Sequence, residues 1–170
     1  TWPGAAAAES ATACMTDADR DGFGSISPSG MATAGTDCDD GDASTWPGAA
    51  AVDSATACMK DADGDGYGSG SPSSTAVAAG TDCDDTDGTV SPGSPETVGD
   101  EKDSHCDGQE LCYTDADGDG YASSSVTVVS EDPDCDDPGE EPDTTLSGDC
   151  DDGDHEIHPG AWEIVGDEVD

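Results

Sequence analysis

Three short acidic segments repeat one spacing of aspartates that suits the binding of a hard cation. In each segment Asp occupies positions 1, 3 and 5, Gly occupies position 6, and an aromatic residue occupies position 7. Alternate carboxylates can direct oxygens toward one ion, and the backbone carbonyl of position 7 can add another. We call these segments cassettes. Their predicted metal ligands are Asp17, Asp19, Asp21 and Phe23; Asp61, Asp63, Asp65 and Tyr67; and Asp115, Asp117, Asp119 and Tyr121.

A second acidic motif, Asp-Cys-Asp-Asp-x-Asp, follows every cassette. The cassettes need further ligands, because position 12, where an EF-hand has a bidentate Glu, is Pro28, Pro72 or Val126. We therefore predict that each cassette borrows carboxylates from this companion motif and that each pair holds at least one calcium ion. The expected companion ligands are Asp37, Asp39, Asp40 and Asp42; Asp82, Asp84, Asp85 and Asp87; and Asp149, Asp151, Asp152 and Asp154.

The composition indicates that such ions would have to support the fold. The chain has 42 acidic residues against three basic ones, a formal net charge of -39, and 32% hydrophobic residues. A chain of this kind normally stays disordered, because it cannot bury enough apolar surface to offset the entropy of ordering. We expect divalent cations to remove the charge repulsion and disulfides to cross-link the chain. The same charge excludes nucleic acid as a direct partner, because a polyanion would be repelled.

The chain is a tandem array. Residues 1–25 and 45–69 are identical at 20 of 25 positions, and the cassettes begin at residues 17, 61 and 115. Periods of this size are typical of arrays in which each unit packs on its neighbours. We predict repeat units at residues 1–43, 44–90 and 91–157, with the start of a further unit at 158–170. The chain opens and stops inside a unit, so we expect a window of a longer array, and this window has no apolar run that could span a membrane.

Little regular secondary structure is expected between these motifs. Gly, Pro, Ser, Thr and Asp dominate the sequence, and these residues favour turns. Residues 121–129 contain a β-favouring run, and residues 5–8 and 49–51 are each expected to form one helical turn at most. The predicted fold class is an irregular, loop-rich tandem repeat array with short β pieces, stapled by calcium ions and disulfides.

The eight cysteines favour disulfides over a zinc or redox site, because no Cys-x-x-Cys occurs. Comparison of the repeats predicts bridges within each unit, closing loops of about 25 residues that contribute roughly 3–4 kcal/mol each. The predicted pairs are Cys14–Cys38, Cys58–Cys83, Cys112–Cys150 and Cys106–Cys135. A shifted scheme stays open, in which Cys38 pairs with Cys58 and Cys83 with Cys112, leaving Cys14 and Cys150 to partners outside the window.

Several runs resemble a known family. Residues 92–108, the run from Cys112 to Tyr121, and residues 148–154 resemble the acidic "putative metal-binding motif" repeats of bacterial secreted proteins, which include the repeats of MopE-type surface proteins. The chain is also similar to thrombospondin type 3 calcium repeats. It departs from the family at Val98 and Val165, where many members have Cys. The resemblance implies an extracellular, calcium-binding role on the bacterial cell surface and no enzymatic activity.

Three classes of function compete for this sequence. An enzyme is not expected, because the sequence offers no nucleophile–His pairing and no phosphate-cradling loop. The favoured function is structural: a rigid, self-associating surface fibre or a stalk, stiffened by calcium. The alternative is an adhesin or metal-capturing module that binds a surface ligand or glycan. The three Trp residues are expected to pack between units or to form a ligand platform; they are Trp2, Trp46 and Trp162. The three His residues could bind copper or zinc, but we expect surface groups; they are His105, His155 and His158.

Overall fold

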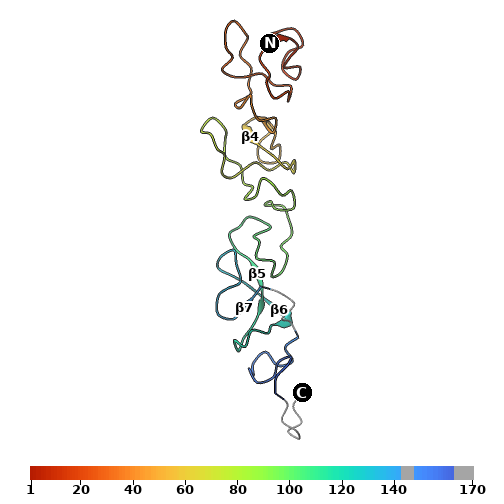
Figure 1. The fold of residues 1–170 in the computed structure, drawn as a ribbon, viewed down its shortest axis with the longest axis vertical. Coiled ribbons are helices and arrows are strands. Elements are labelled where there is room, and N and C mark those ends of the chain that lie inside the picture. Colours follow the sequence, from red (N-terminus) through yellow and green to blue (C-terminus); the bar gives the residue numbers. More distant parts are fainter. Residues whose placement is uncertain (143–147, 163–170) are drawn as a thin grey trace. The chain divides into compact units, whose positions relative to one another are not determined.

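Short strands joined by long turn-rich segments make up the fold (Figure 1). The computed structural model describes residues 1–142 and 148–162, and the chain divides into two units, Thr1–Pro92 and Gly93–Asp170. Within the described ranges there are seven strands and no helix. A helix able to cross a membrane is therefore also missing from these ranges. The predicted loop-rich fold class is confirmed, while its stapling by calcium stays a prediction.

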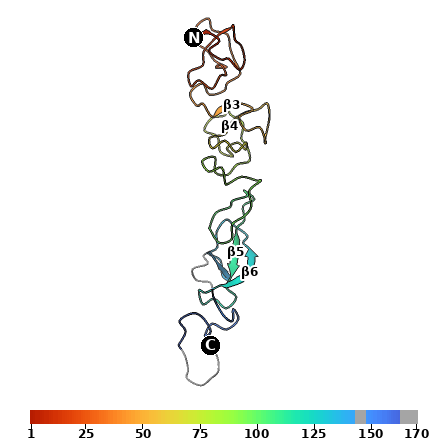
Figure 2. The ribbon, with the colours of Figure 1, turned by 90° about the vertical axis from the view of Figure 1, so that its right-hand side faces the viewer.

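Two small antiparallel ribbons organise the unit Thr1–Pro92. Strand β1 (Trp2–Pro3) pairs with β2 (Cys14–Met15), and β3 (Thr45–Pro47) pairs with β4 (Cys58–Lys60). Figure 2 shows β3 and β4 side by side. In both ribbons a Trp-Pro segment at the start of a repeat pairs with the Cys-Met segment that precedes the cassette. The ribbon therefore fixes where each of the first two cassettes begins.

The alanine-rich segments between the paired strands turn once and stop. The amide of Ser10 donates to the carbonyl of Ala6 at 2.9 Å, and the amide of Ser54 donates to the carbonyl of Ala50 at 2.9 Å. Each bond closes a single turn of the helical type without starting a helix. The expected helical turns therefore occur as isolated turns, at the ends of the predicted segments.

A close approach of two backbone segments places each companion motif beside its cassette. In the second repeat the amide of Asp82 donates to the carbonyl of Gly68 at 2.9 Å, and Ser69 and Asp82 form an isolated parallel bridge. A Cβ atom at Gly80 would overlap the carbonyl of Gly68, so this crossing requires Gly. The first repeat has the equivalent bridge between Ser25 and Asp37.

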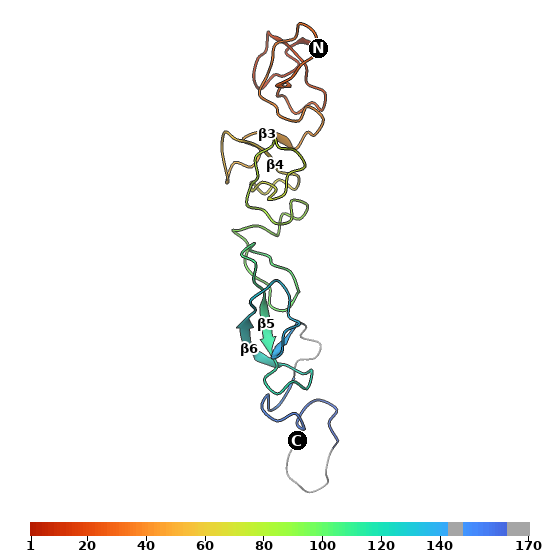
Figure 3. The same ribbon diagram turned by 90° about the vertical axis from the view of Figure 1, so that its left-hand side faces the viewer.

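The unit Gly93–Asp170 is built around a three-stranded antiparallel sheet. Strand β5 (Leu111–Thr114) lies between β6 (Ser123–Val129) and β7 (Glu140–Glu141). Figure 3 shows β5 beside β6, the strand that corresponds to the β-favouring run at residues 121–129. The third cassette forms the connection from β5 to β6. The sheet therefore anchors both ends of that cassette.

Carboxylates occupy much of the interior. The buried hydrophobic residues of the first two repeats include the equivalent pairs Ala6 with Ala50 and Met15 with Met59. The largest fully buried side chains, however, include three carboxylates; they are Glu110, Asp37 and Asp82. A buried carboxylate is costly unless hydrogen-bond donors or a cation compensate it. The interior therefore depends on what these carboxylates bind.

The predicted disulfide scheme is wrong. The structure bonds Cys38 to Cys58 and Cys112 to Cys135. Cys83 and Cys106 are also disulfide-bonded, whereas Cys14 and Cys150 are free and exposed. None of the four predicted pairs forms, namely Cys14–Cys38, Cys58–Cys83, Cys112–Cys150 and Cys106–Cys135. The shifted scheme is right for Cys38–Cys58 and wrong for Cys83–Cys112.

Strand pairing explains the first observed bridge. Strand β3 follows the first companion motif closely, and the register places Cys58 of β4 opposite Pro47 of β3. Cys58 is thereby held near Cys38, which lies in that companion motif. The bridge joins the first repeat to the second, because Cys38 lies within residues 1–43 and Cys58 within residues 44–90.

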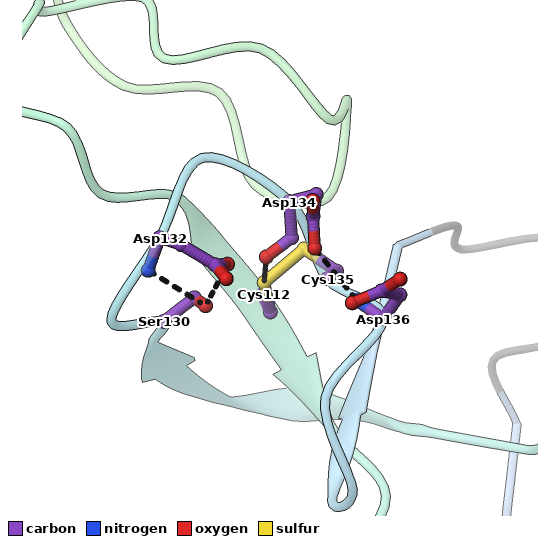
Figure 4. The surroundings of a disulfide bond; sticks show 6 residues. All are labelled: Cys112, Ser130, Asp132, Asp134, Cys135 and Asp136. Carbon is purple, nitrogen blue, oxygen red and sulfur yellow. Dashed lines mark hydrogen bonds between the residues drawn. A yellow bond between two sulfur atoms is a disulfide. The ribbon is translucent and has the colours of Figure 1, made fainter.

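The second bridge lies on the sheet of the other unit. Cys112 of β5 is fully buried, and the chain returns over it after β6. Figure 4 shows Cys135 bonded to Cys112, whose Sγ lies 3.7 Å from the carbonyl oxygen of Asp134. The segment after β6 thus closes onto the strand that precedes the third cassette.

Candidate metal centres

All three cassettes fold into the same loop, in which aspartates accept hydrogen bonds from the loop backbone. In the second cassette the amides of Gly64 and Gly66 donate to the two carboxylate oxygens of Asp61 at 2.7 and 3.1 Å. The amide of Tyr67 donates to Asp65 Oδ1 at 2.8 Å. The third cassette repeats these three bonds at 2.7, 3.0 and 2.8 Å. The first cassette has the equivalents from positions 4 and 7, both at 2.7 Å. The loop conformation is therefore specified locally.

Left-handed backbone at position 4 is part of this conformation. Gly64 and Gly118 occupy it with φ of 83° and 78°, and the first cassette places Arg20 there with φ of 73°. A residue with a Cβ adopts this region at a cost of about 1–2 kcal/mol. The first cassette is therefore the strained copy of the loop.

The companion motif docks on the cassette through one hydrogen bond that recurs in every repeat. The amide of position 2 donates to the third Asp of the motif, as in the 2.8 Å bond from Ala18 to Asp40 Oδ1. The same bond measures 2.8 Å in the second repeat and 3.0 Å in the third. The predicted borrowing of carboxylates has this geometric basis, because each companion motif lies against its own cassette.

Nine carboxylate oxygens in these pairs are buried and have no hydrogen-bond donor. They are the Oδ2 atoms of positions 3 and 5 of each cassette and of the first Asp of each companion motif. The residues are Asp19, Asp21 and Asp37; Asp63, Asp65 and Asp82; and Asp117, Asp119 and Asp149. Buried polar atoms in folded proteins nearly always have a partner. In each repeat the same three oxygens lack a hydrogen-bond donor. Such a recurring set of buried, unpaired oxygens is expected of the ligands of a cation.

The carboxylates are also close enough to repel one another. One oxygen each of Asp17, Asp19 and Asp21 lie within 4.8 Å of one another. Burial raises the pKa of Asp21 to about 6, the Phe23 amide opposes this in part, and the charges of Asp19 and Asp17 add to the increase. Burial likewise raises the pKa of Asp37 to about 6, with Asp21 and Asp19 contributing. These charges need a counter-charge when the carboxylates are ionised.

The second repeat has the same electrostatics. One oxygen each of Asp61, Asp63 and Asp65 lie within 4.8 Å of one another. Burial raises the pKa of Asp82 to about 6, and the charges of Asp63 and Asp65 contribute. The first Asp of the companion motif therefore faces the cassette in both repeats of this unit.

An acidic residue that the sequence analysis did not single out holds the cassette and the companion motif together in each of the first two repeats. Asp53 accepts hydrogen bonds from the amides of Gly68 and Thr81, both at 2.9 Å, and from the Thr81 hydroxyl at 2.6 Å. Burial raises the pKa of Asp53, but these three bonds outweigh it and the net shift is downward. Glu9 has the same role in the first repeat, where it binds the Gly24 amide at 2.8 Å. The sequence did contain a signal for this role, because Glu9 and Asp53 are both acidic and lie at equivalent positions of the two repeats.

Some predicted ligands are engaged elsewhere in the structure. Asp42 Oδ1 accepts the Ser44 hydroxyl at 2.7 Å, and its Oδ2 lies 3.0 Å from the ammonium of Lys60. Its equivalent Asp87 accepts the Thr89 hydroxyl at 2.7 Å, and Asp84 accepts the Thr86 hydroxyl at 2.6 Å. These bonds stabilise the turns after the companion motif. Asp42, Asp84 and Asp87 thus each have an oxygen engaged by a side-chain hydroxyl, whereas Oδ2 of the first Asp of the motif has no donor in any repeat.

In the first and third cassettes the aromatic residue at position 7 packs on the residue that precedes the next Pro-Gly. Phe23 stacks on Trp46 with ring centroids 6.3 Å apart, and Tyr121 stacks on His158 at 4.7 Å. Trp46 thereby packs between two repeats, as expected. Trp2 and Trp162 are instead 55% and 97% exposed.

A comparison with known families agrees with this geometry. Residues 37–53, 82–110 and 149–170 match the family model named Cu-binding MopE, which is described as "Putative metal-binding motif". Each match begins at the first Asp of a companion motif. The resemblance to the MopE-type repeats is confirmed, and the chain carries metal-binding motif repeats together with disulfides. No curated protein and no solved structure matches the chain.

Proposed function

We propose that this chain is an extracellular calcium-binding repeat protein of the bacterial surface, with a structural and not a catalytic role. One observation carries the proposal: the three buried Oδ2 atoms without a donor recur in every cassette and its companion motif. A divalent cation at each pair would satisfy these atoms and offset part of the net charge of -39. The disulfide bonding supports secretion, because disulfides persist in oxidising compartments.

The donor chemistry favours calcium at the cassettes. The family name refers to copper, but copper in proteins is held mainly by imidazole and sulfur ligands. The cassettes and their companion motifs offer carboxylate oxygens in flexible turns, which suit six to eight oxygen ligands around calcium. We therefore propose calcium for the cassettes, held by positions 1, 3 and 5 with the first and third Asp of the companion motif.

Contacts between repeats support a stiff array. The bridge from Cys38 to Cys58, the stack of Phe23 on Trp46, and the 3.0 Å pair of Asp42 with Lys60 all join the first repeat to the second. Cations in the cassettes would add ionic cross-links within each repeat. The combination suits a fibre or stalk that transmits force along the chain.

Self-association is proposed from the two free cysteines. Cys150 occupies the companion-motif position that Cys38 fills in the first repeat, and Cys14 occupies the position of Cys58. Since Cys38 and Cys58 bond to each other, Cys150 of one copy has the chemical setting to bond to Cys14 of another. Such a head-to-tail contact gives a filament where the rotation between successive copies does not close a ring.

The second candidate role is a binding module. The exposed rings of Trp2 and Trp162 favour it, because solvent-exposed aromatic rings can stack on a sugar or a partner surface. An adhesin of this kind would still need the calcium-supported scaffold. Both roles therefore predict that metal binding is required for the folded scaffold.

Calcium titration of chelator-treated protein by calorimetry tests the proposal. At least three calcium ions should bind, with copper failing to displace them from the cassettes at equal concentration. Binding of copper to the cassettes in preference to calcium would contradict the assignment of the metal. Absence of any calcium binding would contradict the function as a whole.

A further inference from the structure

The first companion motif and the residues that follow it contact two cassettes at once. We call residues 37–46 the joint segment. On one side it lies against the first cassette through the 2.8 Å bond from the amide of Ala18 to Asp40 Oδ1. The amide of Asp37 also donates at 2.9 Å to the carbonyl of Gly24, which directly follows that cassette. The position of the joint segment therefore depends on the first cassette.

The other side of the joint segment holds the start of the second cassette. The carbonyl of Ser44 accepts a 2.9 Å hydrogen bond from the amide of Asp61, the first residue of that cassette. Asp42 Oδ2 lies 3.0 Å from the ammonium of Lys60, the residue before it. The register of β3 with β4 places Thr45 opposite Lys60, and Thr45 is only 1% exposed. The joint segment therefore determines where Asp61 stands.

Two further links tie the joint segment to both cassettes. Cys38 is bonded to Cys58, two residues before the Lys60 that pairs with Asp42. Trp46, at the other end of the segment, stacks on Phe23 of the first cassette with ring centroids 6.3 Å apart. A displacement of the segment from the first cassette would therefore disturb the start of the second.

The third cassette begins on a different support. The amide of Asp115 donates at 3.1 Å to the carbonyl of Gly139, which belongs to the same unit of the chain. Gly139 directly precedes β7, in which Glu140 lies opposite Thr114 of β5. The start of this cassette is therefore held from within its own unit, and the third cassette serves as an internal reference for the other two.

A cation in the first cassette would hold the joint segment in place. The Oδ2 atoms of Asp19, Asp21 and Asp37 are buried without a donor, and Asp37 is the first residue of the joint segment. Without a cation these like charges repel one another, which acts to separate the segment from the cassette. A bound cation attracts all three oxygens and keeps the segment against the cassette.

We infer that the first and second cassettes bind calcium cooperatively, with the joint segment as the element that couples them. Calcium in the first cassette fixes the segment and, with it, residues 60 and 61, so less ordering remains when calcium enters the second cassette. By thermodynamic linkage, calcium in the second cassette strengthens binding in the first by the same factor. This inference rests on the proposed function, because it concerns calcium in the cassettes.

The test is a calcium titration of the chelator-treated full chain, with the disulfides intact, followed by ¹H–¹⁵N nuclear magnetic resonance. The amides of Gly22, Gly66 and Gly120 report on the first, second and third cassettes, because each stands at position 6. A double variant that disables the first cassette, Asp19→Asn with Asp21→Asn, should weaken calcium binding at the second by about fivefold or more. It should leave the third unchanged.

The reciprocal double variant is Asp63→Asn with Asp65→Asn. It should weaken calcium binding at the first cassette by the same factor, because coupling between two sites is mutual. Unchanged affinity of each cassette when the other is disabled would overturn the inference and leave the proposed function intact. Absence of a calcium response at all three reporter amides would contradict the proposed function, and the inference with it.

A second pair of variants separates the joint segment from a general effect of charge. Trp46→Ala with Lys60→Thr removes the ring stack and the ion pair, and it should reduce the coupling factor to about twofold or less. Trp162→Ala with Lys102→Thr makes the same two changes in the other unit and should leave the factor unchanged. An equal coupling factor in both pairs would assign the effect to charge and overturn the role of the joint segment.

Discussion

The amide of Ala62 donates a 2.8 Å hydrogen bond to Asp85 Oδ1, twenty-three residues further along the chain. Equivalent bonds join Ala18 to Asp40 and Ala116 to Asp152, at 2.8 and 3.0 Å. This bond holds the cassette and its companion motif together, so that their carboxylate oxygens lie close to one another. The aspartates of the companion motif differ in their hydrogen bonds, and the first prediction tests whether they also differ in metal binding.

The first prediction separates ligands from turn residues in one motif. Asp82→Asn should reduce the number of tight calcium sites from three to two, because Asp82 Oδ2 is buried without a donor beside Asp63 and Asp65. Loss of one ligand typically weakens metal binding by about tenfold or more. Calorimetric titration counts the sites directly.

Asp87→Asn is the matched control in the same motif. Asp87 holds a turn through the Thr89 hydroxyl at 2.7 Å, so its replacement should leave three tight sites. Equal loss in the two variants would mean that Asp87 is also a metal ligand, against the geometry described above.

The second prediction concerns the strained copy of the loop. Arg20→Gly should stabilise the calcium-loaded protein by about 0.5–1 kcal/mol, because Arg20 has a φ of 73° that Gly adopts without strain. Arg20→Ala removes the same charge without relieving the backbone and should give no such gain. Thermal unfolding followed by circular dichroism measures both, and an equal gain for Ala would assign the effect to charge.

The third prediction is a pH dependence. In the metal-free protein the raised pKa values of Asp21 and Asp37, both about 6, exceed the ordinary value of 3.8. The folded state therefore holds protons that the unfolded state has lost between these values, so the metal-free fold loses stability as the pH rises through this window.

Calcium affinity should change in the opposite direction, because calcium requires the ionised carboxylates. We expect binding at about pH 7.5 to be at least about tenfold tighter than at about pH 5. Titrations at the two pH values measure this ratio. A flat response would show that these carboxylates are not the ligands.

The fourth prediction concerns the free cysteines. Oxidised protein at high concentration should form a ladder of covalent oligomers on a non-reducing gel, and reducing agent should dissolve it. Cys14→Ser or Cys150→Ser alone should stop the ladder at the dimer, because each leaves one cysteine for bonding. A ladder that persists in the double variant would assign self-association to other contacts.

Sequence reasoning reached the cassettes because their chemistry is local. Alternate aspartates followed by Gly determine the conformation of the loop through local hydrogen bonds. The bonds within residues 61–67 confirm this. The loop-rich fold class followed in the same way from turn-forming residues. The assembly of the predicted ligands around an ion stays a prediction.

The sequence left two disulfide schemes open, because the pairing depends on which strand lies beside which. Pairing of β3 with β4 brings Cys58 to Cys38, and no local signal at either cysteine reports it. The burial of Glu110 could not be predicted for the same reason. Glu110 is buried beside β5, and nothing in the sequence distinguishes this glutamate from the other acidic residues of the chain.

The central claim, that metal holds this acidic chain in its fold, is tested most directly by small-angle scattering before and after removal of calcium, with the disulfides left intact. The account predicts that the radius of gyration increases and that proteases then cleave the repeats, because 42 acidic residues repel one another without counter-charge. Restoring calcium should reverse both changes. An unchanged radius and unchanged protease resistance after complete removal of calcium would contradict the account and assign the fold to the disulfides alone.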